Sequence, residues 1–399
     1  MDASGDPPRR AGGGRYEVLD SLRGVAAVMI VVMHFNTDGL VQPSAFVTRS
    51  WLFVDFFFVL SGVVIAKSYG PKLGAGVGFL DFALLRLGRL YPLHLAVLAA
   101  FLAFELLKLA IGGGVGGRGA FSGKMSVEDL ALTAGFVQIF RGELSSAWNF
   151  PSWSISAEFW TYLIFGAVCA GLGRSRWLLL APLALGCAAV RVLAPEATLL
   201  GLDMGALARC LFTFLLGVAI AGPMPPPQRP GGPARLGDTL AEAACVPLVV
   251  TIVLAAPAWL APLGFAVVIW VFARQRGLIS AALLHPLPAK LGTLSYSIYM
   301  VHAFVQARIM DALLVAEKRL GAPGALIETT PGKDILQGGP GIADLGTALM
   351  LVAVVLVARV THRWVELPGQ AWSRRLVARR HGRRDGPEVR PEEAAVGAP

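Results

Sequence analysis

Residues 17–36 read EVLDSLRGVAAVMIVVMHFN, and this stretch indicates the fold. After Arg23 its side chains are apolar almost without a break. Its length matches the run of about 20 residues with which an α-helix crosses about 30 Å of hydrocarbon. It lacks the sustained period-two alternation of a barrel strand. The stretch therefore predicts a membrane-spanning helix.

Stretches of this kind recur along the 399 residues. The composition agrees, because 55% of residues are hydrophobic and only 15% are charged, a balance that a soluble fold could hardly cover with polar surface. The sequence predicts an all-α, polytopic integral membrane protein with about ten transmembrane helices. The predicted spans are residues 17–36, 50–69, 88–111, 152–172, 176–194, 206–222, 237–255, 257–274, 291–315 and 343–365.

The polar ends of the chain flank one membrane domain. We expect a disordered cytoplasmic N-terminus over residues 1–15, the membrane domain over 16–368, and a disordered cytoplasmic tail over 369–399 that is first basic and then acidic. The first apolar run carries Asp20 and Arg23, so it does not resemble a cleaved signal peptide and is expected to remain as a span. The short amphipathic run 125–140 is either interfacial or re-entrant.

The distribution of Lys and Arg predicts the orientation. With the N-terminus inside, the inner connectors and the tail carry more than twice as many of these residues as the outer side, to which Arg191 and Arg209 are assigned. This bias places both termini in the cytoplasm and the spans in the inner (plasma) membrane. Much of the net charge of +9 lies in the basic tail, which suits contact with anionic membrane lipids. So little soluble chain argues against a nucleic-acid partner.

The four cysteines give no sign of a metal or disulfide site. Cys169, Cys187, Cys210 and Cys245 all lie in apolar runs, without CxxC spacing and without neighbouring histidines. We therefore expect no metal, no haem and no disulfide framework.

The first span carries the most informative polar residues. Arg23 and His34 are eleven residues apart, which on a helix places them on nearly one face and roughly 16 Å from each other. Asp20 shares that face. Either Asp20 and Arg23 form a structural ion pair and His34 fills a helix contact, or His34 is a general base at membrane depth with Arg23 nearer the cytoplasm. The spacing alone leaves both interpretations open.

Polar residues in or beside other spans are further candidates. Asp55 and Glu158 lie toward the outer ends of their predicted spans, where each could orient His34 or bind acceptor hydroxyls, or serve as a structural hydrogen-bond partner. On the ninth predicted span a polar stripe either lines a site or joins helices. The stripe consists of Ser295, Tyr299 and His302.

Six motifs in order resemble the acyltransferase-3 family of integral-membrane O-acyltransferases. The resemblance extends over about residues 16 to 368, and the first motif matches the family pattern of Arg, ten residues and His. The motifs are LDSLRG (19–24) leading to His34-Phe35, VDFFFVLSG (54–62), RLGRLYP (86–92), WSISAEFW (153–160), LSYSIY (294–299) with His302, and ELP (366–368).

This resemblance implies transfer of an acyl group, often acetyl from acetyl-CoA, to a hydroxyl of a carbohydrate or another extracytoplasmic or lipid-linked acceptor. Some relatives carry an additional soluble esterase-like domain after the membrane part, and we expect none here. In this setting Arg86 and Arg89, three residues apart at the cytoplasmic end of the third span, are suited to grip the phosphates of acyl-CoA. Alternatively, they only signal topology.

The sequence therefore predicts an enzyme in which His34 deprotonates the acceptor, supported by Arg23 and Glu158, while Arg86 and Arg89 hold the donor. Asp20, Asp55 and the stripe on the ninth span have supporting or substrate-binding roles. Two other classes remain open. A transporter or flippase for a lipid-linked glycan would also place charges on span faces, and a scaffold would use Arg23 and His34 only to join helices.

Overall fold

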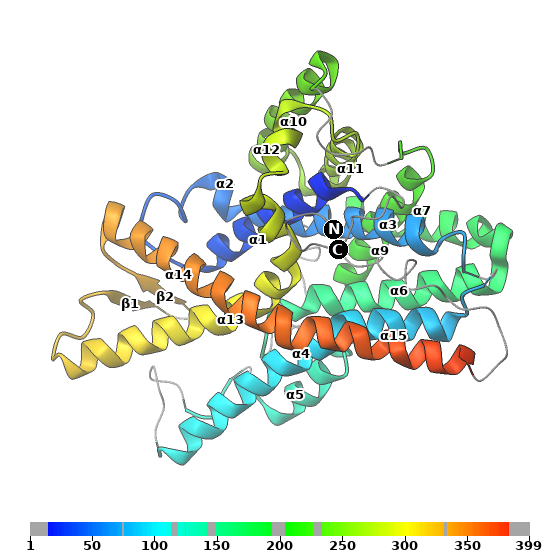
Figure 1. The fold of residues 1–399 in the computed structure, drawn as a ribbon. Helices are drawn as coiled ribbons and strands as arrows, with labels where there is room; N and C mark the ends of the chain where they lie inside the picture. The colour runs from blue at the N-terminus through cyan, green and yellow to red at the C-terminus, as the bar shows by residue number, and fades with distance from the viewer. Residues whose placement is uncertain are drawn as a thin grey trace, which may run out of the picture.

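The computed structural model describes residues 15–73, 76–112, 119–123, 125–141, 148–193, 204–226, 234–330 and 333–382. Within these ranges the chain is mainly helical (Figure 1). The longer helices are α1 (Glu17–His34), α3 (Phe53–Tyr69), α4 (Phe79–Ala110), α6 (Ser152–Leu172), α7 (Trp177–Leu193), α9 (Met204–Ala221), α10 (Leu236–Leu254), α11 (Ala261–Phe272), α13 (Pro286–Arg319), α14 (Gly339–Thr361) and α15 (Leu367–Gly382). The shorter helices are α2 (Ala45–Thr48), α5 (Val127–Ala134) and α12 (Leu278–Leu283).

Each predicted span overlaps one of these helices, but the number of about ten transmembrane helices is not confirmed. In the described residues, six helical segments are long and apolar enough to cross a membrane, and two shorter apolar helices accompany them. Helix α1 is not among the six, because three charged residues lie within its 18 residues. Helix α11 has 12 residues, which extend only about 18 Å. Charged residues inside a helix of the bundle indicate a functional role for α1.

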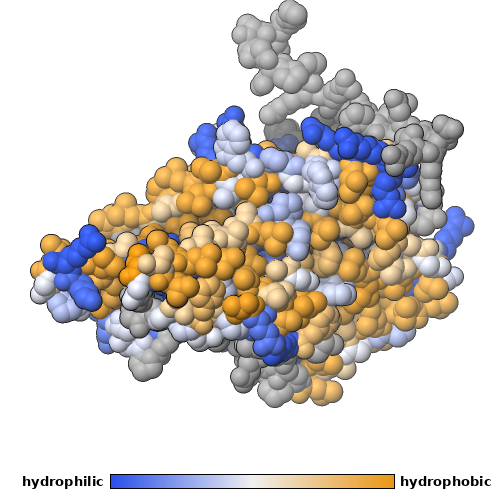
Figure 2. All heavy atoms as spheres, turned by 90° about the horizontal axis from the view of Figure 1, so that it is seen from below, coloured by the Kyte–Doolittle hydropathy of each residue, from blue (hydrophilic) through white to orange (hydrophobic). Residues whose placement is uncertain are grey.

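The exposed face of α14 shows why this fold requires lipid. Every third or fourth residue along it is a large aliphatic side chain that is more than half exposed, which water would not favour. Figure 2 likewise shows a face that is mostly hydrophobic, with hydrophilic residues gathered toward its edges. These residues of α14 are Ile342, Leu345, Leu349, Val352, Leu356 and Val360, each between 56% and 61% exposed.

Glycines allow the central helices to approach closely. A Cβ atom on Gly24 of α1 would lie 2.4 Å from the backbone nitrogen of Gly292 on α13. On α3, a Cβ atom on Gly62 would lie 2.0 Å from the carbonyl oxygen of Phe214 on α9. Such small-residue contacts are typical of membrane helix packing, where backbones must come together without a hydrophobic driving force. They fix α1, α3, α9 and α13 as the centre of the bundle.

Two segments differ from the predicted all-helical bundle with a disordered tail. The expected loop before α14 contains an antiparallel hairpin of β1 (Ile327–Thr330) and β2 (Lys333–Leu336). Its second strand continues to the segment after α1, where the amide of Leu336 donates to the carbonyl of Asn36 at 3.0 Å. Residues 369–382, which we expected to be disordered, form most of α15.

Helix α15 is ordered because it packs along α4. Ser373 fills the notch left by Gly88, and Gly369 contacts Pro92. At the far end, Nε2 of His381 lies 2.9 Å from a carboxylate oxygen of Asp81. The disordered tail was predicted from the arginines of this segment. The small residues Gly369 and Ser373 on its other face allow it to pack against α4 instead. Residues 1–14 and 383–399 lie outside the described ranges.

The run 125–140 folds as two short pieces, α5 and a 3-10 turn over Gln138–Phe140. Helix α5 has eight residues, too few to cross a bilayer. It is held against the bundle where Nε2 of His94 lies 2.9 Å from the carbonyl oxygen of Thr133. Nearby, the indole of Trp160 donates to the carbonyl of Phe136 at 2.8 Å.

Candidate active site

Two neighbouring cavities contain most of the predicted site residues. The large cavity has a volume of about 820 Å³, part of it open to the outside. The small cavity has a volume of about 480 Å³, which also includes space open to the outside. Val54 and Tyr299 line both, so these two side chains form the partition between them. Polar groups of the large cavity are Arg23, Ser61, Arg86, Arg89, Ser154, Glu158, Tyr162, Ser295, Tyr296 and Tyr299.

Arg23 joins α1 to α13 at the large cavity. Its Nε donates to the hydroxyl of Ser295 at 2.8 Å, and its Nη2 donates to the carbonyl of Gly292 at 3.2 Å. Nη2 also lies 3.5 Å from a carboxylate oxygen of Asp20, which in turn pairs with Arg15 at 2.6 Å. The ion pair of the structural interpretation therefore exists, and the same guanidinium also lines the cavity.

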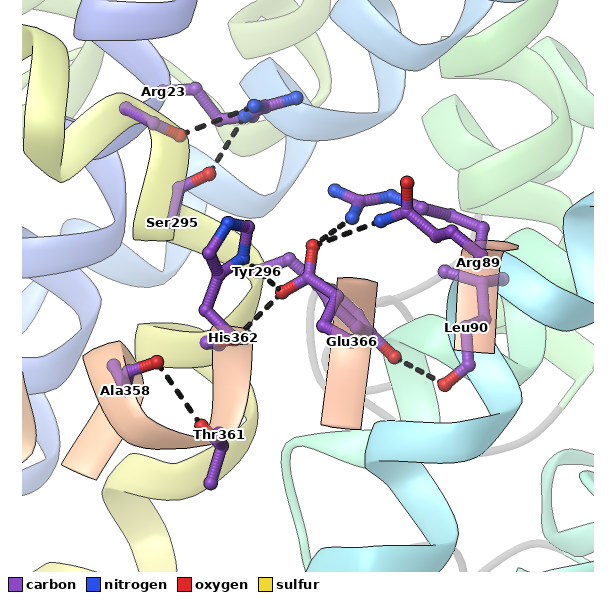
Figure 3. A network of polar contacts seen from close by, with 12 residues as sticks. Arg23, Arg89, Leu90, Ser295, Tyr296, Ala358, Thr361, His362 and Glu366 are labelled. Carbon is purple, nitrogen blue, oxygen red and sulfur yellow. Dashed lines mark hydrogen bonds and ion pairs between the residues drawn. The ribbon is translucent and has the colours of Figure 1, made fainter. Parts of the chain in front are cut away.

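Arg89 forms a buried ion pair with Glu366, as Figure 3 shows. Three further side chains surround the same carboxylate. The hydroxyl of Ser297 donates to it at 2.7 Å, the amide of Gln370 donates at 3.3 Å, and Nδ1 of His362 lies 3.0 Å away. Arg89 therefore has a structural role, because without it Glu366 would be a buried charge with no ion-pair partner of opposite charge at this position.

Arg86 is held more loosely. One of its terminal nitrogens donates to the hydroxyl of Tyr69 at 2.9 Å, and its guanidinium lies 4.9 Å from the centre of that ring. Its Nε is buried without a hydrogen-bond partner among the described residues. No carboxylate pairs with Arg86 in the described part of the chain, so its charge remains available to an anion in the cavity.

Beside Arg86, hydroxyl groups connect α6 to α3, and the Arg86 guanidinium lies 5.9 Å from the centre of the Tyr162 ring. The hydroxyl of Tyr162 donates to Glu158 at 2.5 Å and lies 2.6 Å from the hydroxyl of Ser61. Glu158 therefore lines the large cavity and accepts a hydrogen bond from the Tyr162 side chain. It does not contact His34.

His34 ends α1 and lines the small cavity, next to a second histidine. Its Nδ1 lies 3.3 Å from Nε2 of His302, and Phe150 packs edge-on against it with ring centres 4.6 Å apart. Nδ1 of His302 lies 2.6 Å from the carbonyl oxygen of Tyr299. A carbonyl only accepts, so in a neutral ring that nitrogen carries the proton and Nε2 accepts from His34. This network leaves the Nε2 lone pair of His34 available as a base.

Asp55 has a different environment from the one we expected. It is fully buried between two arginines, with Nη2 of Arg191 at 2.8 Å and Nε of Arg209 at 2.8 Å. Both of its oxygens are occupied, so His302, rather than Asp55, contacts His34. Sequence reasoning assigned Arg191 and Arg209 to the outer connectors. They are 2% and 1% exposed, and their positions inside the predicted spans 176–194 and 206–222 were the signal of a buried role.

Sequence reasoning also missed several partners of the site. Glu366 was part of a motif without a role, and Tyr162, Tyr69 and Ser297 had none. The partners of Glu366 lie far away in the chain, since Arg89 is 277 positions and Ser297 is 69 positions from it, so nothing in the local sequence connects them. Tyr162 follows Glu158 by four residues, and this helical spacing was a signal of their contact. Among the described residues, no group of three or more His, Cys, Asp or Glu side chains is placed to hold a metal ion.

A helical bundle with a lipid-facing surface, an arginine-lined cavity and an adjoining histidine pair defines a membrane-embedded protein with a polar internal site. The chain belongs to the acyltransferase-3 family, whose sequence profile, described as "Acyltransferase domain", matches residues 16–359. Membership of this family favours the enzyme over the transporter and the scaffold.

Two curated relatives are similar over part of their length. "Protein 2 in picA locus" of Rhizobium radiobacter is 41% identical over 101 residues, which are 25% of this chain and 50% of that protein. "Acyltransferase MdmB" of Streptomyces mycarofaciens is 31% identical over 168 residues, which are 40% of each chain. The chain thus aligns with about half or less of these relatives. No solved structure matches it.

Proposed function

We propose that this protein transfers an acetyl group from acetyl-CoA to a hydroxyl of a carbohydrate or another extracytoplasmic or lipid-linked acceptor. The observation that carries the proposal is the convergence of Arg23, Arg86 and Arg89 on one large cavity in a member of an acyltransferase family. Arg89 and Arg23 have carboxylate partners in Glu366 and Asp20, whereas Arg86 has none in the described part of the chain, so its charge is available to the donor. Such a cavity suits the phosphates of coenzyme A.

The donor occupies the large cavity in this proposal. The cavity is partly open to the outside, so a long donor can enter it from there. Arg86 grips a phosphate, with Arg89 held beside it by Glu366. The pantetheine arm carries the thioester toward Tyr299, and Glu158 with Tyr162 lines its path.

The acceptor enters the small cavity, where His34 takes the proton. The acceptor oxygen attacks the thioester carbonyl carbon, the carbon–sulfur bond breaks, and the thiolate of coenzyme A leaves. The proton passes from the hydroxyl to Nε2 of His34 and then to the departing thiolate. Because Val54 and Tyr299 divide the cavities, the Tyr299 side chain moves aside for the two substrates to meet.

The positions of Arg23 and His34 along α1 give the orientation of the protein in the membrane in this proposal. Arg23 and the large cavity lie toward the cytoplasm, where acetyl-CoA is available, and His34 lies about three helical turns further out. Both chain termini are then cytoplasmic and the membrane is the inner membrane. The strand contact after α1 places the hairpin β1–β2 near the acceptor side.

The test is mass spectrometry of the envelope glycans and lipids of host cells with the gene, without it, and with a His34→Ala allele expressed at equal level. We expect an acetyl mass difference of about 42 Da on one class of molecule, present only with the wild-type gene. Glycans and lipids that are identical in all three strains would overturn the proposal.

A further inference from the structure

The end of the large cavity beside the partition is mostly apolar. Val54 and Tyr299 close it, and Phe57 lies one helical turn from Val54 on α3. The ring of Phe57 packs edge-on against that of Tyr299, with ring centres 6.0 Å apart. We call this region the apolar end of the cavity. Its lining residues are Val54, Phe57, Phe58, Ser154, Ile155 and Tyr299.

The two hydroxyl groups of the apolar end are engaged with each other and with the backbone. The oxygens of Ser154 and Tyr299 lie 2.8 Å apart. They also lie 3.1 and 3.2 Å, respectively, from the carbonyl oxygen of Pro151, which accepts hydrogen bonds there. A ligand group in the apolar end therefore meets hydrocarbon and aromatic rings for the most part.

The charged residues that line the large cavity lie further from the partition. Glu158 follows Ser154 by one helical turn along α6. The hydrogen-bond partner of Arg23 is Ser295, which lies one turn before Tyr299 on α13. Both charges are thus at least one turn deeper in the cavity than the apolar end.

Arg86 and Arg89 also lie away from the partition. Arg86 donates to the hydroxyl of Tyr69, which ends α3 fifteen residues after Val54, or about 22 Å further along the helix. The guanidinium of Arg89 lies 5.1 Å from the centre of the Tyr296 ring. Because an ionised group costs free energy when it is buried away from water and from a partner, the apolar end suits an uncharged part of a ligand.

We infer that the apolar end binds the acyl group of the donor, that this group is a short uncharged chain, and that Phe57 limits its length. The inference rests on the proposed function, which brings the thioester to Tyr299 and the phosphates to Arg86. The acyl chain is attached to the carbonyl carbon that the acceptor attacks, so in that reaction it lies beside the partition.

Phe57 is the residue of the apolar end that is best placed to set the chain length. Its side chain is only partly buried, whereas Phe58 is 2% and Ile155 is 6% exposed. Truncation of Phe57 therefore enlarges the cavity with less loss of packing than truncation of either neighbour. The enlarged space lies where the chain would grow beyond acetyl.

The experiment is equilibrium binding of acetyl-CoA, hexanoyl-CoA and succinyl-CoA to the purified full-length protein in detergent. We expect the wild type to bind acetyl-CoA at least about tenfold more tightly than either of the others. Hexanoyl-CoA tests the length of the chain, and succinyl-CoA tests its charge. If either one binds as tightly as acetyl-CoA, the inference is wrong.

Phe57→Ala should lower the Kd of hexanoyl-CoA at least about tenfold, because the additional methylene groups then have an apolar space to fill. The Kd of acetyl-CoA should stay within about threefold of the wild-type value, and succinyl-CoA should remain a weak ligand. If Phe57→Ala does not fold, Phe57→Leu should change the ratio of the hexanoyl-CoA and acetyl-CoA Kd values in the same direction by a smaller factor. An unchanged ratio in the variant that folds contradicts the inference.

Val64→Ala is the matched control. Val64 lines the same cavity and is also partly buried, but it lies seven residues beyond Phe57 on α3, or about 10 Å deeper. The ratio of the two Kd values should be the wild-type ratio in this variant. If Val64→Ala changes the ratio as much as Phe57→Ala does, the chain lies deeper in the cavity and the inference is overturned.

The acetyl-CoA measurement separates this inference from the proposed function. If the wild type binds none of the three thioesters, the proposed donor is wrong and the inference fails with it. If acetyl-CoA binds but truncation of Phe57 does not change the preference for chain length, only the acyl site is wrong.

Discussion

At the scale of single residues, the histidine pair has the most direct consequences for catalysis. Because the carbonyl of Tyr299 fixes His302, and His302 accepts from His34, we propose that His302 is a positioning residue that keeps His34 in one tautomer for the proposed reaction. We expect His34→Ala to lower the rate of acetyl transfer by about 10²–10⁴-fold. His302→Ala should lower kcat by about 10- to 100-fold with an unchanged KM for the acceptor.

These rates are measured with radiolabelled acetyl-CoA in membranes that contain equal amounts of each variant. His285→Ala, an exposed position before α13, serves as the matched control and should behave as the wild type. A His302→Ala enzyme with the wild-type kcat would show that the pair has no role in positioning.

Arg89 and Glu366 make a prediction about stability. Truncating one member leaves the other as a buried charge, so Arg89→Ala should reduce the free energy of unfolding by about 3–5 kcal/mol. Replacing both by methionine should restore most of that loss. Thermal unfolding in detergent measures both effects. If the single variant is as stable as the wild type, then the ion pair contributes nothing to the fold, and Arg89 is free to serve the donor alone.

At the scale of helices, close packing at glycine positions holds the site together. Helix α3 carries the partition residue Val54, and α9 carries Arg209. We expect Gly62→Ala to force these two helices apart and to lower stability by about 1–3 kcal/mol. Gly186→Ala in α7 is the control, since a Cβ atom there has no neighbour within 4 Å. It should leave Tm unchanged or slightly higher. Equal Tm values for the two variants would argue against a tight contact between α3 and α9.

Helix positions were largely predictable, because a run of apolar residues long enough for the bilayer leaves few alternatives to a helix. The predicted spans 17–36 and 152–172 fall within two residues of α1 and α6. Helix α15 was not predictable in the same way, because its packing depends on small residues of α4 that are distant in sequence. The hairpin β1–β2 was missed because its partner is the segment after α1.

The site residues show the same division. Their grouping was predicted from polar residues in or beside apolar runs, and Arg23, Arg86, Arg89, Glu158 and Ser295 do line one cavity; their roles in catalysis or binding stay predictions. Their pairings did not follow, because Arg89 with Glu366 and His34 with His302 are contacts between distant helices. The separation of His34 from the arginines by Tyr299 likewise depends on side-chain positions in the folded bundle.

At the scale of the whole molecule, the orientation in the membrane is the main untested expectation. The basic face of α15 contains Arg374, Arg375, Arg379 and Arg380, and positive residues near spans remain in the cytoplasm. A green fluorescent protein fused to the C-terminus should therefore fluoresce, whereas alkaline phosphatase at the same position should be inactive. Active phosphatase together with a dark fluorescent fusion would reverse the orientation and place the large cavity on the outer side.

The proposed function depends on the large cavity being the acyl-donor site. Equilibrium binding of acetyl-CoA to the purified protein tests this most directly, with Arg86→Gln as the probe and Arg308→Gln as the control. Arg308 pairs with Asp311 at 2.6 Å and lines neither cavity. We predict measurable binding by the wild type, a Kd raised at least about tenfold in Arg86→Gln, and no change in Arg308→Gln. Absence of binding by the wild type, or equal affinity in Arg86→Gln, would contradict the account.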